Sequence, residues 1–125
     1  MDMMTPLRRV RGLGSAKAGT EHFWQQRLTA VSNFFLISFF IIFLIWLHDG
    51  TYADMRAAFA NPLIGIGMAL TMMSVTYHMR LGVQVVIEDY IHGDAKIPLL
   101  ILNNFFAIAI AAASLFAIVK MSFGA

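Results

Sequence analysis

Three long runs of apolar residues, each free of charged side chains, divide the chain into its main parts. Positions 28–47, 57–79 and 97–119 contain no Asp, Glu, Lys or Arg. A helix rises about 1.5 Å per residue, so about twenty residues cross a hydrocarbon core of about 30 Å. The pattern predicts an all-α membrane protein with three transmembrane helices, over about 27–47, 60–88 and 98–120.

The segment before the first run differs from the rest in being polar, basic and rich in glycine. This composition is too polar to form a core unaided, so residues 1–20 are expected to be a cytoplasmic basic arm. Thr20 is a candidate N-cap, which predicts that the first helix begins near Glu21. Residues 21–125 then form the three-helix transmembrane anchor.

Polar and helix-breaking residues separate the three predicted helices. The first helix is expected to end before His48-Asp49-Gly50. Asn61-Pro62 marks the start of the second helix, because proline is tolerated in the first helical turn, and this helix extends to about Tyr90. Pro98 closes the next loop, so the third helix is expected to begin near Leu99.

Composition agrees with a protein that faces lipid. The chain is 59% hydrophobic and 13% charged, whereas a soluble domain is about half apolar and about a quarter charged. Most cations precede the first run, and the positive-inside rule therefore predicts a cytoplasmic N-terminus and, after three spans, a C-terminus on the outer side of the membrane. Topology accounts for these cations without a nucleic-acid partner: they are Arg8, Arg9, Arg11, Lys17 and Arg27.

One face of the second helix carries small and polar side chains. Steps of three and four residues from His78 keep to one narrow arc of a helix. In lipid, such a stripe indicates close approach by another helix or by a flat ligand. Gly82, one turn from His78, removes a side chain that would obstruct a ring plane held by the imidazole. The arc consists of Gly67, Thr71, Ser74, His78, Gly82, Val85 and Asp89.

His78 is the candidate for chemistry on this face. It lies eleven residues before Asp89, about 16 Å along a helix axis and so near the membrane midplane. An intramembrane histidine is a functional hypothesis by default, and neutral imidazole is a good axial ligand for haem iron. A hydrogen bond to a neighbouring helix explains the residue equally well. Because the other three histidines fall near or beyond the span ends, a second axial ligand must come from another chain.

Three further residues invite functional and structural interpretations. Tyr90 at the inner boundary suits a hydrogen bond to a quinone carbonyl, or membership of an aromatic belt. Arg27 suits an ion pair with a haem propionate, or simple positive-inside anchoring. Arg80 lies about 200° around the helix from His78, so it must snorkel inward, meet an anionic group or border a wet cavity.

Two segments carry a resemblance to a known family. Residues 14–31 and 78–90 are similar to the signatures of the small hydrophobic membrane-anchor subunit of succinate dehydrogenase, of the alphaproteobacterial and mitochondrial type. The resemblance implies half of a two-subunit anchor bundle that shares a haem b, with His78 as one axial ligand and Gly82 packing against the ring. It also implies that Arg27 lies near the haem propionates, and that Tyr90 and Asp89 contact ubiquinone. The resemblance assigns no role to Arg80.

The same resemblance implies the partners and the reaction. They are a second hydrophobic anchor subunit (a cytochrome b), an iron–sulfur subunit and a flavoprotein subunit that oxidises succinate, so this chain has no independent activity. Two alternatives remain: a haem-free structural anchor of a respiratory complex, and a small transporter component. The transporter is disfavoured because the sequence has neither paired intramembrane carboxylates nor an inverted repeat.

Overall fold

The structure is a computed structural model that describes residues 5–7 and 16–124. Within residues 16–124 the chain forms helices α2 (Ala16–Trp46), α3 (Tyr52–Ala60), α4 (Pro62–Tyr90) and α5 (Lys96–Phe123), and no residue in the described ranges lies in a strand. The all-α prediction is therefore confirmed. Most of the predicted arm over 1–20 lies outside the described residues.

Two helices are long and apolar enough to cross a membrane: α2 over Thr20–Trp46 and α5 over Lys96–Phe123. Helices α3 and α4 together supply a third candidate, although they are bent by 94° at the break between them. The side chains that face outward are themselves apolar, since Phe34 is 70% exposed and Ile108 is 63% exposed. In water such a surface would promote aggregation, whereas in lipid it is an ordinary outer face.

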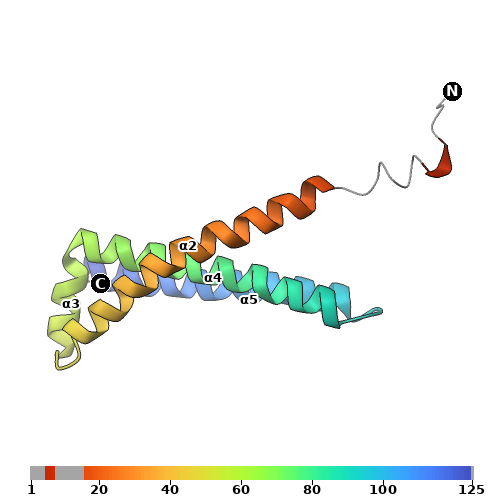
Figure 1. The fold of residues 1–125 in the computed structure, drawn as a ribbon. Coiled ribbons are helices and arrows are strands. Elements are labelled where there is room, and N and C mark those ends of the chain that lie inside the picture. The colour runs from red at the N-terminus through yellow and green to blue at the C-terminus, as the bar shows by residue number, and fades with distance from the viewer. Residues whose placement is uncertain (1–4, 8–15, 125) are drawn as a thin grey trace.

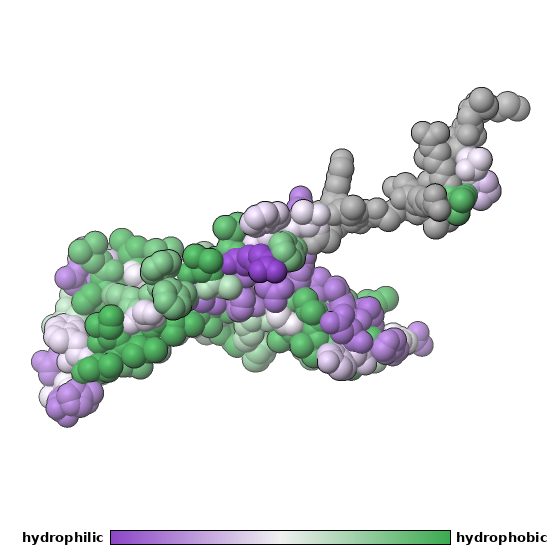
Figure 2. Space-filling model, viewed as in Figure 1, coloured by the Kyte–Doolittle hydropathy of each residue, from purple (hydrophilic) through white to green (hydrophobic). Residues whose placement is uncertain are grey.

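Helix α4 is the central element. It packs on α2 and on α5, while the backbones of α2 and α5 do not contact each other. Figure 1 shows α4 and α5 side by side, α3 across one end, and α2 crossing this pair at an angle so that its first half separates from it. In Figure 2 hydrophobic surface covers the crossing, and hydrophilic surface gathers at the two ends and in the angle between α2 and α4.

The buried core lies at the α3 end of the molecule. Phe43, Ala58, Phe59 and Met68 are buried together, and the rings of Phe43 and Phe59 meet edge to face with centroids 5.7 Å apart. These residues come from three helices, so the packing holds α3 in the corner between α2 and α4. The opposite ends of α2 and α4 lack such a cluster among the described residues, which leaves room for them to separate.

Two predicted helix starts are wrong by a few residues. Helix α2 begins at Ala16 and not near Glu21, so Thr20 lies inside the helix and is not its N-cap. Helix α5 begins at Lys96, which places Pro98 in the first turn. Proline is tolerated there because the first amide nitrogens of a helix have no intrahelical acceptor. The start of α4 at Pro62 and its end at Tyr90 are confirmed.

Helix α3 was not anticipated from the sequence, and a capping box starts it. Thr51 Oγ1 accepts a hydrogen bond from the Asp54 amide at 3.3 Å, and Asp54 Oδ2 accepts from the Thr51 amide at 2.8 Å. The Thr51 side chain also donates to Asp54 Oδ2 at 2.7 Å. These bonds favour the carboxylate, so the Thr51 hydroxyl first and the Thr51 amide second lower the pKa of Asp54 below its usual 3.8.

Asn61 and Pro62 produce the bend between α3 and α4. Asn61 ends α3 in an extended conformation, and its Oδ1 accepts a hydrogen bond from the Leu63 amide at 3.0 Å, so it also caps α4. Pro62 then occupies the first helical position, where its missing N–H is not needed. One asparagine therefore closes one helix and opens the next.

Candidate functional site

The first half of the predicted small and polar stripe packs against α2. A Cβ on Gly67 would lie 2.9 Å from ring atoms of Phe39, so the glycine lets that ring lie on the α4 backbone. Two turns further along α4, Ser74 Oγ donates to Asn33 Oδ1 at 2.7 Å and contacts Ser32 Oγ at 2.9 Å. In this half of the helix, the close approach that the stripe predicts is made by the chain's own α2.

His78 lies where this contact ends, and it is hydrogen-bonded to α2. Its Nδ1 is 2.9 Å from Thr29 Oγ1. Thr29 has one hydroxyl proton, and that proton is directed at main-chain oxygens of its own helix, at 2.8 Å from Gln25 and 3.1 Å from Gln26. With that proton on its own helix, the Thr29 oxygen accepts from His78 in the tautomer that carries the hydrogen on Nδ1. This tautomer leaves Nε2 with a free lone pair, which is the form of histidine that binds a metal.

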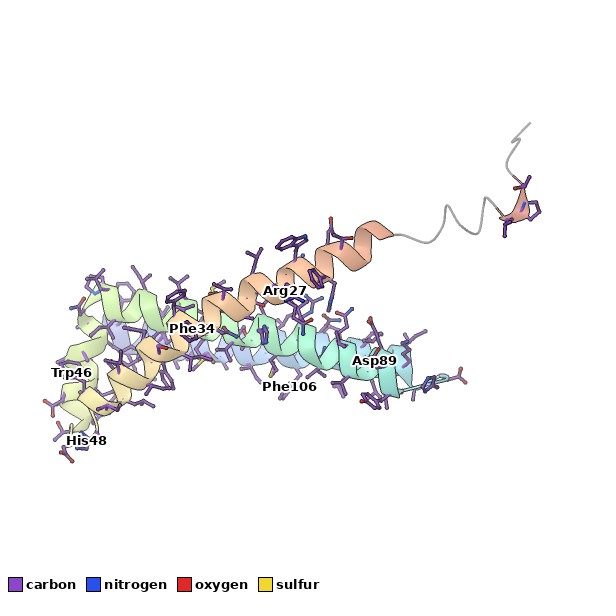
Figure 3. The ribbon with its side chains drawn as sticks, viewed as in Figure 1. Arg27, Phe34, Trp46, His48, Asp89 and Phe106 are labelled. Carbon is purple, nitrogen blue, oxygen red and sulfur yellow. The ribbon has the colours of Figure 1, made fainter. Side chains whose placement is uncertain are left out.

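Beyond His78 the stripe is open. A Cβ on Gly82 would meet no atom within 4 Å, in contrast to the tight position of Gly67 on the same arc. The reason is visible in Figures 1 and 3, where the half of α2 that carries Arg27 leaves α4 and opens an angle between the two helices. We call this space, beside Gly82 and between the first half of α2 and the second half of α4, the wedge.

An unpartnered polar atom lies on the α2 side of the wedge. His22 stands seven residues, or two turns, before Thr29, and therefore on the same face of α2. Its Nε2 is buried and has no hydrogen-bond partner among the described residues. A buried nitrogen of this kind normally has a partner, so the hydrogen bonding of His22 is incomplete within the part of the chain that the structure describes.

The other predicted site residues do not gather around His78. Arg27 is exposed on α2, and its guanidinium lies 4.1 Å from the centroid of the Phe23 ring. Asp89 and Tyr90 are exposed in the last turn of α4, where Figure 3 labels Asp89. Tyr90 stands twelve residues, about 18 Å, from His78 along the helix axis. Within the described residues no group of three His, Cys, Asp or Glu side chains is placed to hold a metal ion.

A second polar cluster, which the sequence did not predict, lies between α4 and α5. The Nε of Arg80 donates to Asn104 Oδ1, and Asn103 Nδ2 donates to the main-chain oxygen of Arg80 at 2.9 Å. Asn103 is only 7% exposed. The signal that could have found this cluster is the adjacent Asn pair inside the third apolar run, because amides in a span need partners from another helix.

The chain is similar to known membrane proteins of one family. The family model described as "Succinate dehydrogenase/Fumarate reductase transmembrane subunit" matches residues 1–119. A succinate dehydrogenase hydrophobic membrane anchor subunit of Paracoccus denitrificans is 30% identical over 125 residues, covering 100% of this chain and 97% of that protein.

Two further relatives are also 30% identical. The subunit of the same description from Rickettsia bellii aligns over 97 residues, 72% of each chain. A succinate dehydrogenase membrane anchor subunit of Reclinomonas americana aligns over 82 residues, 62% of this chain and 68% of that protein. No solved structure matches the chain.

Proposed function

The chain belongs to the succinate dehydrogenase/fumarate reductase transmembrane subunit family, and we infer that it is the small membrane anchor of a succinate:ubiquinone oxidoreductase. It is a multi-pass membrane protein by its apolar helices and by its relatives. In this proposal it tethers a flavoprotein and an iron–sulfur subunit to the bacterial inner membrane, and has no independent activity. The basic residues before the first span support a cytoplasmic N-terminus and a periplasmic C-terminus.

The observation that carries the haem part of the proposal is the bond between His78 and Thr29. In this proposal Thr29 accepts from Nδ1–H and Nε2 faces the iron, which is how a second residue orients a metal-binding histidine. The open position at Gly82 provides space beside that imidazole. These residues fit a haem b, with a second anchor subunit supplying the other axial ligand. Bound haem would supply a one-electron redox centre.

Arg27 is assigned a supporting role toward the same group. It is exposed, so its guanidinium is available to a propionate carboxylate and is held only by the face of Phe23. Its position two residues before Thr29 places it on the helix that flanks the wedge. Gly82 acts by lacking a side chain that would occupy the same space.

Ubiquinone reduction is assigned to the end of α4. The reaction takes two electrons from the iron–sulfur subunit and two protons, and converts the two quinone carbonyls to hydroxyls. Tyr90 is 77% exposed, so its hydroxyl is free to donate a hydrogen bond to one carbonyl oxygen while the ring lies in the apolar layer. Asp89 is exposed beside it as an acidic neighbour. The rest of the pocket comes from the other subunits.

Spectroscopy of the purified complex tests the haem assignment. His78→Ala is expected to abolish the haem absorption band while flavin remains in the complex. His48→Ala is the matched control, because His48 is exposed at the opposite end of α2 and contacts the main-chain oxygen of Ile45. Unchanged absorption and redox midpoint in His78→Ala would reject His78 as a ligand.

A haem-free structural anchor is the second candidate. The same Thr29 contact favours it, because a histidine that is hydrogen-bonded to a neighbouring helix has a structural reason to be in a membrane. This candidate predicts that a purified wild-type complex contains flavin and iron–sulfur clusters but no haem. The haem content of the wild-type complex therefore decides between the two.

A further inference from the structure

Arg80 is a cation whose charge is unbalanced within the part of the chain that the structure describes. Guanidinium remains protonated at any physiological pH. The described residues contain no carboxylate within ion-pair distance of Arg80; their one close acid–base pair is His48 with Asp49. An unbalanced charge inside a membrane costs several kcal/mol, so Arg80 requires a counter-ion from outside this chain.

Neighbouring residues hold Arg80 in one orientation. Asn104 Nδ2 donates to the main-chain oxygen of Leu100 at 2.9 Å, which turns Oδ1 toward Arg80 Nε. The guanidinium carbon also lies 5.8 Å from the centroid of the Tyr77 ring. Because Nε is occupied, the two Nη groups remain available with four N–H donors, and that fork matches the two oxygens of a carboxylate.

Arg80 and Asn104 lie at one end of an apolar groove. The groove has a volume of about 1170 Å³ and is lined by α2, α4 and α5. It lies between the two outer helices, α2 and α5, whose backbones do not contact each other. From Arg80 it extends along α4 to Leu70 and along α5 to Ala111. Ten residues of α4 correspond to about 15 Å, about half the hydrocarbon thickness.

Depth distinguishes a lipid headgroup from a protein side chain as the counter-ion. Arg80 precedes Glu88 by eight residues, and Asn104 follows Lys96 by eight, so each helix places the pair about 12 Å inside its charged end. Those ends adjoin each other, since Lys96 Nζ donates to the Glu88 main-chain oxygen at 3.2 Å. Half of a hydrocarbon core is about 15 Å, so a lipid phosphate cannot reach Arg80 without leaving the headgroup layer. A carboxylate on a transmembrane helix can.

A haem propionate is another source of such a carboxylate. His78 is absent from the residues that line the groove, but the lining includes Thr29, the hydrogen-bond partner of His78, and Ser74 of the same arc. The cross-linking experiment below distinguishes a carboxylate on a helix from one on a haem.

We propose that the groove receives a transmembrane helix of the second anchor subunit, and that this helix carries an Asp or Glu whose carboxylate pairs with Arg80. The proposal rests on the two-subunit anchor put forward above. Three helices that leave two outer members apart form an incomplete four-helix arrangement, and the fourth helix completes it. The pair would also fix the rotation and height of the incoming helix, since only one register brings the charges together.

Photocross-linking in the intact complex tests the position. A photoreactive amino acid replaces Ile108, which lines the groove, and the matched control replaces Phe34, which is similarly exposed but is not among the residues that line it. The expected adduct from position 108 is a peptide of the second anchor subunit with an Asp or Glu within one turn of the linked residue. Adducts with lipid alone, with a second copy of this chain, or with the same peptide from position 34 would overturn the proposal.

A charge-removal pair tests the ion pair itself. Arg80→Gln is expected to lower the amount of flavoprotein retained on membranes by about tenfold or more, because it leaves a buried carboxylate unpaired. Neutralising the cross-linked Asp or Glu as well should restore retention, and Arg56→Gln, which removes an exposed cation in α3, should leave it unchanged. A double variant no better than Arg80→Gln would overturn the pair. If membranes that contain the wild-type chain bind no flavoprotein, this result rejects the proposed anchor function and not the ion pair.

Discussion

Gly67 and Gly82 share one arc of α4 but have opposite surroundings, and substitution at each should therefore fail in a different way. A Cβ at position 67 would lie 2.9 Å from Cε1 and Cζ of Phe39, whereas ordinary contact begins at 3.4 Å. The ring must therefore move by 3.4 − 2.9 = 0.5 Å or more. A Cβ at position 82 meets nothing within 4 Å, so larger side chains fit there in the isolated chain.

The effect of each substitution on stability depends on the cost of overpacking and on the gain in helix propensity. Overpacking typically costs about 1–3 kcal/mol, and replacing glycine by alanine in a helix returns about 1 kcal/mol. Gly67→Ala is therefore expected to weaken the α2–α4 contact by up to about 2 kcal/mol. Gly82→Leu gains helix propensity and loses no packing within the chain, but it fills the wedge in which haem is proposed to bind.

Two measurements on the purified complex separate these effects. The ratio of haem to flavin is read from absorption, and thermal stability is read from the temperature at which quinone reductase activity is lost. Gly67→Ala should lower the inactivation temperature and keep the haem to flavin ratio. Gly82→Leu should lower the ratio first. A full complement of haem in Gly82→Leu would refute the wedge as the haem site, and an unchanged inactivation temperature in Gly67→Ala would refute the reading of the Phe39 contact.

Two further predictions concern the exposed ends of the helices. Tyr90→Phe should lower succinate:quinone reductase activity while succinate oxidation with an artificial acceptor is retained, since only the hydrogen bond to the quinone is lost; equal loss of both activities would indicate failed assembly instead. Because the folded pKa of Asp54 is depressed, its contribution to α3 is present above the usual value of 3.8 and is lost as pH falls through the lowered value. Amide-exchange protection in the first turn of α3 should fall in that acidic range, and Thr51→Ala should remove most of this pH dependence; an unaltered dependence in the variant would contradict the assignment.

The start of one helix followed from the sequence because two start signals stand together. Asn61 is a cap and Pro62 suits the first helical position, and α4 begins there although both residues lie inside the second charge-free run. No proline marks the start of helix α3. Its start is encoded by the capping box of Thr51 and Asp54, which the sequence contains. The helix was missed because its nine residues are too few to give a clear hydropathy signal.

The sequence predicted which residues of α4 share a face, but not which of them α2 covers. Helical spacing correctly placed Ser74, His78 and Gly82 on one face. It could not show that α2 covers the first two and leaves the third open, because that depends on the angle at which α2 crosses α4. The partners on α2, Thr29 and Asn33, were missed for the same reason: each is an ordinary polar residue in an apolar run until a second helix lies against it.

Polar groups in a membrane need partners, and the chain satisfies them unevenly. Around Ser74 and the Nδ1 of His78, helix α2 supplies every acceptor and donor that is required. Around Gly82 helix α2 supplies nothing, and at Arg80 helix α5 supplies one neutral acceptor, Asn104 Oδ1, for a positive charge. The described residues of this chain complete neither place. Groups from outside the chain are required, and this is the physical reason for expecting the chain to function only as part of a larger membrane assembly.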